Sequence, residues 1–79
     1  MNRAVIYLPR FSDPAARVAA YLSADLVEYS STVFGEVFDR YREIIAVMSV
    51  GIAVRGIAPF IRDKWTDPAV VVVTPDLQL

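Results

Sequence analysis

The stretch from Met48 to Val73 constrains the fold of this chain more strongly than any other segment. It starts at the end of an apolar run, passes through a turn into a segment with helical spacing, and reaches Pro59. Proline lacks a backbone donor and clashes with the preceding turn, so a helix should end or kink there. A charged loop, residues 62–68, and five apolar residues, 69–73, complete the stretch. The pattern predicts a buried strand, a helix, a charged loop and a second buried strand.

The same alternation runs through the whole chain. Short apolar runs with β-branched members occur at Ala4–Leu8, Ile44–Met48 and Ala69–Val73, and Leu26–Tyr29 is a second, shorter candidate strand. Such runs are typical of buried parallel strands. Because crossovers between parallel strands are right-handed, few arrangements are open to this chain. The sequence predicts an α/β three-layer sandwich with a four-stranded parallel sheet, in the order 2-1-3-4 when the strands are numbered along the chain.

Helices are expected between these strands, and each has candidate N-terminal caps. The candidates are Ser12 or Asp13 followed by Pro14, one of residues 30–32, and Ser49. The third helix is expected to bury an apolar face formed by Val50, Val54, Ile57 and Ile61. Gly56 in its interior costs about 1 kcal/mol relative to alanine, and close approach of another backbone would explain its presence.

Composition limits what the chain can do. Its 79 residues make one domain, and 56% of them are hydrophobic, which predicts either a dense core or apolar surface that a missing domain or a partner covers. A net charge of −1 without a basic block argues against nucleic-acid binding. The longest uncharged stretch, Ile44–Val54, is too short to span a membrane, and a cytoplasmic protein is expected. The absence of histidine and cysteine excludes a thiol nucleophile, a histidine base and a Cys/His zinc site within this chain.

The stretch that starts at Met48 also resembles the N-terminal domain of the cobalamin-biosynthesis family CbiG, the cobalt-precorrin-5A hydrolases. The matching positions are Gly51, Ile52, Val54, Arg55, Ile57, Ala58, Pro59, Asp63, Lys64 and residues 67–73. Gly56 departs from the family, which usually has a larger apolar residue there. The resemblance implies that residues 1–79 form a single CbiG N-terminal-like α/β domain. This domain ends before the family's Ser-Gly-His segment and C-terminal domain.

The resemblance also implies a function. Enzymes of this family open the δ-lactone of a cobalt-bound macrocycle and release acetaldehyde in anaerobic cobalamin (vitamin B12) biosynthesis. The cobalt belongs to the substrate, so no cofactor of the protein's own is expected. The implied partners are the carboxylated cobalt-corrinoid intermediate and either the missing C-terminal part of the hydrolase or further copies of the chain. The alternative is a non-catalytic binding or scaffolding module that keeps the fold and associates with itself or a partner chain.

Candidate substrate-binding residues follow from the expected topology. Ligands of open parallel sheets bind beyond the carboxyl ends of the strands, where helix N-termini favour anions. We expect Ser30, Ser49, Gly51 and Arg55 to bind carboxylates of the macrocycle, with Arg55 as a bidentate clamp. Each has a structural alternative, namely capping for the serines, packing for the glycine and a solvated surface position for the arginine. The family's glycine after Tyr-Ser is Ser31 here, and the sequence indicates no catalytic residue.

A second cluster, Asp63, Lys64 and Asp67, places a lysine between carboxylates. The predicted topology puts this loop at the opposite edge of the sheet, which favours a structural role. In that role Asp67 sets a turn before Pro68 and Lys64 neutralises the two carboxylates. Trp65 on the same loop is expected to be partly exposed, as would suit an interface.

Overall fold

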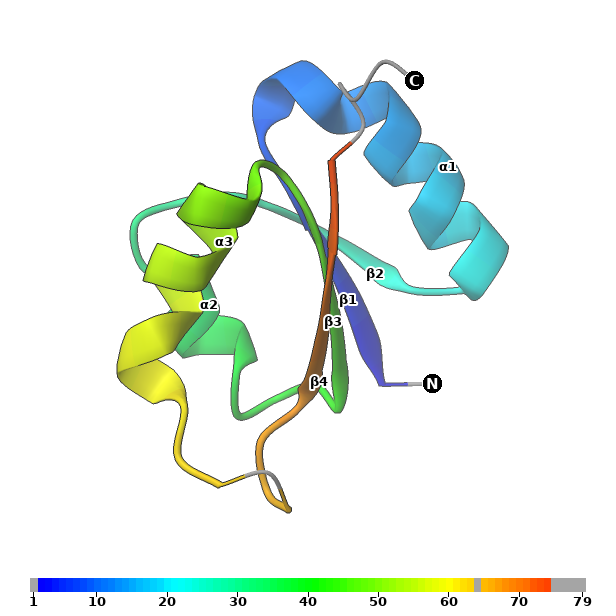
Figure 1. Ribbon diagram of the computed structural model, residues 1–79. Coiled ribbons are helices and arrows are strands. Elements are labelled where there is room, and N and C mark those ends of the chain that lie inside the picture. The colour runs from blue at the N-terminus through cyan, green and yellow to red at the C-terminus, as the bar shows by residue number, and fades with distance from the viewer. Residues whose placement is uncertain (1, 64, 75–79) are drawn as a thin grey trace.

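Four parallel strands form one sheet in the computed structural model, which describes residues 2–63 and 65–74 (Figure 1). The strands are β1 (Arg3–Tyr7), β2 (Asp25–Glu28), β3 (Glu43–Val47) and β4 (Ala69–Val73). Their order is β2-β1-β3-β4, and all three pairings are parallel. The predicted α/β class, sheet and strand order are confirmed. Val5 pairs with Ile45, and Ile45 pairs with Val71, so these three side chains share one face of the sheet.

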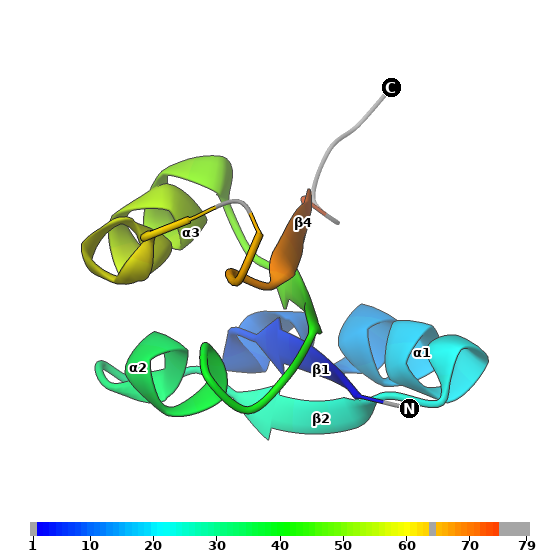
Figure 2. The same ribbon diagram turned by 90° about the horizontal axis from the view of Figure 1, so that it is seen from below.

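The helices divide unequally between the two faces. Figure 2 shows α1 (Ser12–Leu22) on one side of the sheet and both α2 (Val33–Val37) and α3 (Val50–Ile57) on the other. Two short 3-10 helices, η1 (Pro9–Phe11) and η2 (Ala58–Phe60), precede α1 and follow α3. Because the step from β1 to β2 runs opposite to the two later steps across the sheet, right-handed crossovers place the helices in this way.

Two apolar clusters, one on each face, make the core. The α1 face buries Val5, Ala15, Ala19, Ile45 and Val47. The other face buries Ile6, Val33, Phe34, Val37, Phe38, Ile44, Ala46, Met48 and Ala53. Phe38 also packs against Phe60, with the ring centroids 5.9 Å apart. The larger cluster lies under α2 and α3, so the face with two helices contains more of the buried residues.

The predicted caps are right for α3 and wrong for α1. The Ser49 hydroxyl accepts the Ile52 backbone N–H at 3.4 Å, as expected for an N-cap. Neither Ser12 nor Asp13 caps α1, because the 3-10 turn at Pro9 leads directly into it and Phe11 occupies the cap position. Ser12 is already the first helical residue, and its backbone N–H bonds to the carbonyl of Pro9.

The start of α2 also differs from expectation. Thr32 stands at the cap position, but its hydroxyl donates to the Glu36 carboxylate at 3.0 Å instead of accepting from the backbone. The helix has only five residues, so it offers a weak dipole at its N-terminus. The Ser30 hydroxyl lies 3.4 Å from that of Thr32, while its backbone carbonyl accepts from Val33.

Helix α3 ends where Pro59 requires, at Ile57, but its buried face is not the predicted one. The buried residue is Ala53, and Ile57 is half-buried. Val50 and Val54 are 55% and 53% exposed, and Ile61 beyond the helix is 59% exposed. The stripe exists at the predicted spacing, but α3 packs against α2 through its other flank, at Gly56. No helix in residues 2–63 and 65–74 is long and apolar enough to cross a membrane.

Candidate functional site

The turns after β2 and β3 lie at the carboxyl edge of the sheet. The backbone N–H of Tyr29 bonds to the Tyr7 carbonyl at 2.8 Å, and this bond ties the turn after β2 to the end of β1. Met48, after β3, bonds to the Val73 carbonyl at 3.0 Å in the same way. Since neighbouring strands are about 4.8 Å apart, β1 keeps the two turns roughly 10 Å from each other.

A shallow cleft of about 360 Å³ opens between the turn after β2 and the side of α3 that carries Ile52, Arg55 and Gly56. We call it the α3 cleft. Its walls are aromatic and aliphatic, with a hydroxyl and a guanidinium as the polar groups. The lining residues are Tyr29, Ser31, Ile52, Arg55, Gly56, Pro59 and Phe60. The cleft therefore combines an apolar surface with one cation, as binding of a carboxylate-bearing ring would require.

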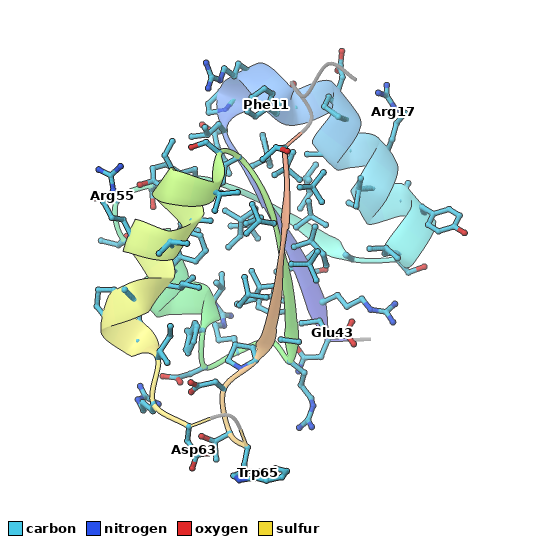
Figure 3. All side chains as sticks on the ribbon, in the orientation of Figure 1. Phe11, Arg17, Glu43, Arg55, Asp63 and Trp65 are labelled. Atoms are coloured by element: carbon cyan, nitrogen blue, oxygen red, sulfur yellow. The ribbon has the colours of Figure 1, made fainter. Side chains whose placement is uncertain are left out.

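Arg55 is the cation of the α3 cleft. Figure 3 shows its side chain extending from α3 away from the sheet. Its Nη2 atom lies 3.7 Å from the position that a Cβ on Gly51 would occupy, so the side chain folds back toward the N-terminus of α3. Among the residues that the structure describes, no hydrogen bond or ion pair engages the Arg55 guanidinium. All five of its donors are therefore available to a bound anion.

The structure brings together only some of the four predicted site residues. Gly51 and Arg55 are neighbours on α3, and Ser49 lies at the start of that helix with its hydroxyl committed to capping Ile52. Ser30 does not line the α3 cleft; the adjacent Ser31 does. The difference arises because the Ser30 hydroxyl points toward Thr32.

Sequence reasoning missed the apolar wall of the α3 cleft. Pro59 was recognised only as a helix stop and Gly56 only as a costly helix residue, but both line the cleft together with Phe60. The expected reason for Gly56 was close approach of a backbone. Instead, the Phe34 ring takes the space, and a Cβ at residue 56 would lie 2.5 Å from Phe34 Cε2. Only the unusual glycine in an apolar helix signalled close packing there.

The charged loop lies at the opposite, amino edge of the sheet, as Asp63 and Trp65 in Figure 3 show. The Asp67 carboxylate accepts the backbone N–H groups of Arg62 at 2.7 Å and Asp63 at 3.0 Å, and Asp63 accepts that of Trp65 at 2.8 Å. These contacts give the two aspartates a loop-closing role, as predicted. Lys64 lies outside the described residues. Trp65 is 82% exposed, more than expected.

A polar cavity of about 500 Å³ also lies at the amino edge, lined by residues 38–42, residues 65–68 and Asn2. Two of its carboxylates already have partners: Asp67 closes the loop, and Asp39 forms an ion pair with Arg62 at 3.4 Å. Within residues 2–63 and 65–74, no group of three or more histidine, cysteine or acidic residues could hold a metal ion. We therefore regard the α3 cleft, with its uncommitted arginine at the ligand-binding edge, as the stronger candidate.

Known proteins share both sequence and fold with this chain. The sequence model of the family described as Cobalamin synthesis G N-terminal matches residues 32–79. The cobalt-precorrin-5A hydrolase of Priestia megaterium is 53% identical over 36 residues, which cover 46% of this chain and 10% of that protein. The cobalt-precorrin-5A hydrolase of Salmonella typhimurium is 47% identical over 38 residues, 48% of this chain and 11% of that protein.

A solved structure supports the fold. The crystal structure of a cobalamin biosynthesis protein G homolog from Sulfolobus solfataricus aligns with a TM-score of 0.68 at 21% identity. The alignment covers 90% of this chain and 25% of that chain. At this identity the likeness shows the fold alone. The part of this chain that aligns with the curated relatives thus covers only about a tenth of their length.

Proposed function

Because this chain belongs to the Cobalamin synthesis G N-terminal family, we propose that it contributes to binding the carboxylated cobalt-corrinoid intermediate in a protein of the cobalt-precorrin-5A hydrolase type. Both curated relatives carry that hydrolase name, but the aligned part of this chain covers only about a tenth of their length. The proposal therefore concerns a binding contribution to cobalamin biosynthesis. The observation that carries it is the Arg55 guanidinium, which no described residue engages, beside the mainly apolar α3 cleft that starts at the turn after β2.

The chemistry of the α3 cleft suits a macrocycle fringed with acetate and propionate groups. A planar guanidinium can bind a carboxylate through two parallel hydrogen bonds, which fixes the orientation of the ligand. Ile52, Pro59 and Phe60 offer apolar surface to the ring edge beside that carboxylate. The Ser31 hydroxyl, across the cleft from α3, can add a further hydrogen bond.

The reaction itself requires groups from elsewhere. The chain has no histidine and no cysteine, so it lacks the commonest general base and the thiol nucleophile. We expect residues 1–79 alone to release no acetaldehyde from cobalt-precorrin-5A. An assay for acetaldehyde with the purified chain tests this, and turnover above the background without protein would refute it. A cytoplasmic location, expected from the composition, stays a prediction.

Binding can be tested by titration with cobyrinic acid, a cobalt corrinoid with free carboxylates. Each hydrogen bond to a charged group is worth about 1.5–3 kcal/mol, so Arg55→Ala should weaken binding about tenfold or more. Arg55→Lys should retain only part of the affinity, because an ammonium cannot form the bidentate fork. The folded state should change little, since the Arg55 side chain is exposed.

Arg62→Ala is the control, because Arg62 is also an exposed arginine but lies at the amino edge of the sheet. It should leave the affinity for cobyrinic acid unchanged. If Arg55→Ala binds as tightly as the parent chain, or if Arg62→Ala loses more affinity, the proposed location of the site is wrong. A corrinoid whose carboxylates are all amidated should bind more weakly than cobyrinic acid to the parent chain.

One observation favours the alternative of a non-catalytic module that associates with itself or a partner. Val50, Val54 and Ile61 form an exposed apolar stripe on the flank of α3 that faces away from α2. Stripes of this kind mark interaction surfaces. Sedimentation at micromolar concentration should show dimers or larger species that Val54→Glu converts to monomers. A parent chain that is already monomeric and captures no partner would count against this alternative.

A further inference from the structure

The α1 face of the sheet is only partly covered. Figure 2 shows α2 and α3 side by side over one face, whereas α1 lies alone over the other, beside β1 and β2. Ile45 and Val47 of β3 are buried in the cluster with α1, but in the described residues no helix lies over β4 on the α1 side. Parallel sheets are normally buried on both faces. The α1 side of β4 is therefore an apolar part of the sheet that no described helix covers.

An apolar groove of about 410 Å³ lies between α1 and the uncovered side of β4, and we call it the β4 groove. Its floor includes Ile45, Val71 and Val73, and Val18 and Leu22 of α1 form its wall. The Arg3–Glu43 ion pair closes one end.

The exposed fractions of neighbouring strand residues show where the sheet lacks a packing layer. Val5, Ile45 and Val71 lie in register on three neighbouring strands, and their exposed fractions are 0%, 8% and 57%. Burial thus falls away with distance from α1. On α1, Tyr21 stands three residues after the groove residue Val18, and it is 89% exposed. Val71 on the edge strand β4 and Tyr21 on α1 thus both expose large apolar side chains.

The width of the open area fits one helix. Strands about 4.8 Å apart place the outer axes of a four-stranded sheet roughly 14 Å from each other. Helices pack about 8–10 Å apart, so each face accommodates two. The opposite face carries two, α2 and α3, and the α1 face carries one. One helix is therefore the cover that completes the second layer.

We propose that the β4 groove is the docking site of an amphipathic helix from the family polypeptide outside the region that this chain represents. The curated relatives are about ten times longer than the part that matches, and the solved homolog is about four times longer. The docking helix presents apolar residues at i, i+3 or i+4, and i+7 to Ile45, Val71 and Val73, and its opposite side is polar. The proposal rests on family membership and goes beyond the corrinoid site, which lies on the other face.

A second copy of the chain fits the groove less well. The free edge of β4 could pair with β4 of another copy about a two-fold axis normal to the sheet. That axis keeps α1 and its copy at the two outer ends of the joined sheet, and the groove between them stays open. The exposed floor around Val71 requires another layer, which edge pairing does not supply.

The test uses overlapping 20-residue peptides that cover the rest of the Priestia megaterium hydrolase. Each is titrated into the isotope-labelled full chain, and amide shifts are followed by NMR. We expect a peptide with an apolar helical stripe to bind saturably and to shift residues that line the β4 groove, Val18, Leu22, Val71 and Val73 among them. A scrambled peptide of the same composition should not bind.

Matched variants separate the two faces. Val71→Glu should weaken binding of that peptide at least tenfold, and Val54→Glu should leave it unchanged, because the two valines are equally exposed on opposite faces. Val71→Thr keeps the β-branched shape of the strand residue and should cause a smaller loss. Circular dichroism verifies that each variant is folded.

Three outcomes would overturn the proposal. They are the absence of any binding peptide up to millimolar concentration, shifts confined to the exposed flank of α3, and concentration-dependent shifts in the groove without peptide. The last would identify a second copy as the occupant. Arg55→Ala should not affect peptide binding, so failure of the corrinoid proposal and failure of this one are distinguishable.

Discussion

The Phe34 ring of α2 packs directly on the backbone of Gly56 in α3. A Cβ at residue 56 would lie 2.5 Å from Phe34 Cε2 and closer still to Cδ2. Phe34 is only 3% exposed and cannot swing aside into solvent. The glycine therefore sets how closely α3 approaches α2, and it turns the Val50–Val54 flank outward.

This contact predicts that Gly56→Ala destabilises the domain although alanine is the better helix former. Overpacking of a core costs about 1–3 kcal/mol, and helix propensity returns about 1 kcal/mol. A net loss of up to about 2 kcal/mol is expected in urea unfolding.

Gly51→Ala is the matched control in the same helix. A Cβ at residue 51 would meet only Arg55 Nη2, at 3.7 Å, an ordinary contact. This variant should be as stable as the parent or gain up to about 1 kcal/mol. Greater stability of Gly56→Ala than of Gly51→Ala would show that the Phe34 packing does not control this interface.

The Ser49 cap should also be measurable. Ser49→Ala removes the acceptor for the Ile52 N–H and should cost about 0.5–2 kcal/mol. Ser12→Ala serves as the comparison, because Ser12 begins α1 as a helical residue and not as its cap. Equal losses for the two variants in urea unfolding would contradict the assignment of Ser49 as the functional cap.

The Tyr41 hydroxyl donates to the Asp25 carboxylate at 2.7 Å, which joins the loop after α2 to the start of β2. This hydrogen bond, with smaller contributions from burial and the negative charge of Asp25, raises the pKa of Tyr41 above its usual value. The folded state holds the proton more tightly than the unfolded state. The stabilisation is therefore complete below about pH 10, the unfolded pKa, and is lost as the pH rises through the higher folded pKa.

Ultraviolet absorbance of the tyrosinate provides the test. Asp25→Ala should lower the pKa of one tyrosine toward its ordinary value. The variant should be less stable at neutral pH and should no longer show the alkaline loss of stability that this bond causes. Tyr41→Phe should remove the same titration from the spectrum. A tyrosine titration that Asp25→Ala leaves unchanged would refute the hydrogen bond.

Asp67 should matter to stability and not to corrinoid binding. Its carboxylate accepts two backbone N–H groups, so Asp67→Ala should cost about 1–3 kcal/mol, and Asp67→Asn less because one acceptor oxygen remains. Cobyrinic acid affinity of the folded Asp67→Asn variant should equal that of the parent. A selective loss of affinity would implicate the amino edge in ligand binding.

Much of the fold could be predicted because its signals are local. Continuous apolar runs marked three of the four strands, and the likeness to a doubly wound fold predicted their order. Ser49 and Pro59 act on the backbone of their own helix, so their roles as cap and stop were readable. The start of α1 was not, because the 3-10 turn at Pro9 bypasses the serine and aspartate that could have capped it.

The candidate site was only partly predictable for a related reason. The sequence indicated that Arg55 and Gly51 are neighbours, because residues four apart on one helix lie on the same side. The wall formed by Phe60 and Ser31 joins segments far apart in the chain, and their meeting depends on the angle at which α3 crosses α2.

By itself, the sequence determined the parallel sheet and its order, the ends of α3 and the absence of histidine and cysteine chemistry. Only the tertiary structure decided which flank of α3 is buried, which groups line the α3 cleft and which part of the α1 face stays open. Periodicity shows that a helix has an apolar stripe, but not which neighbour it meets. Here the packing of the Phe34 ring on Gly56 decides which side of α3 meets α2, and Val50 and Val54 therefore lie on the surface.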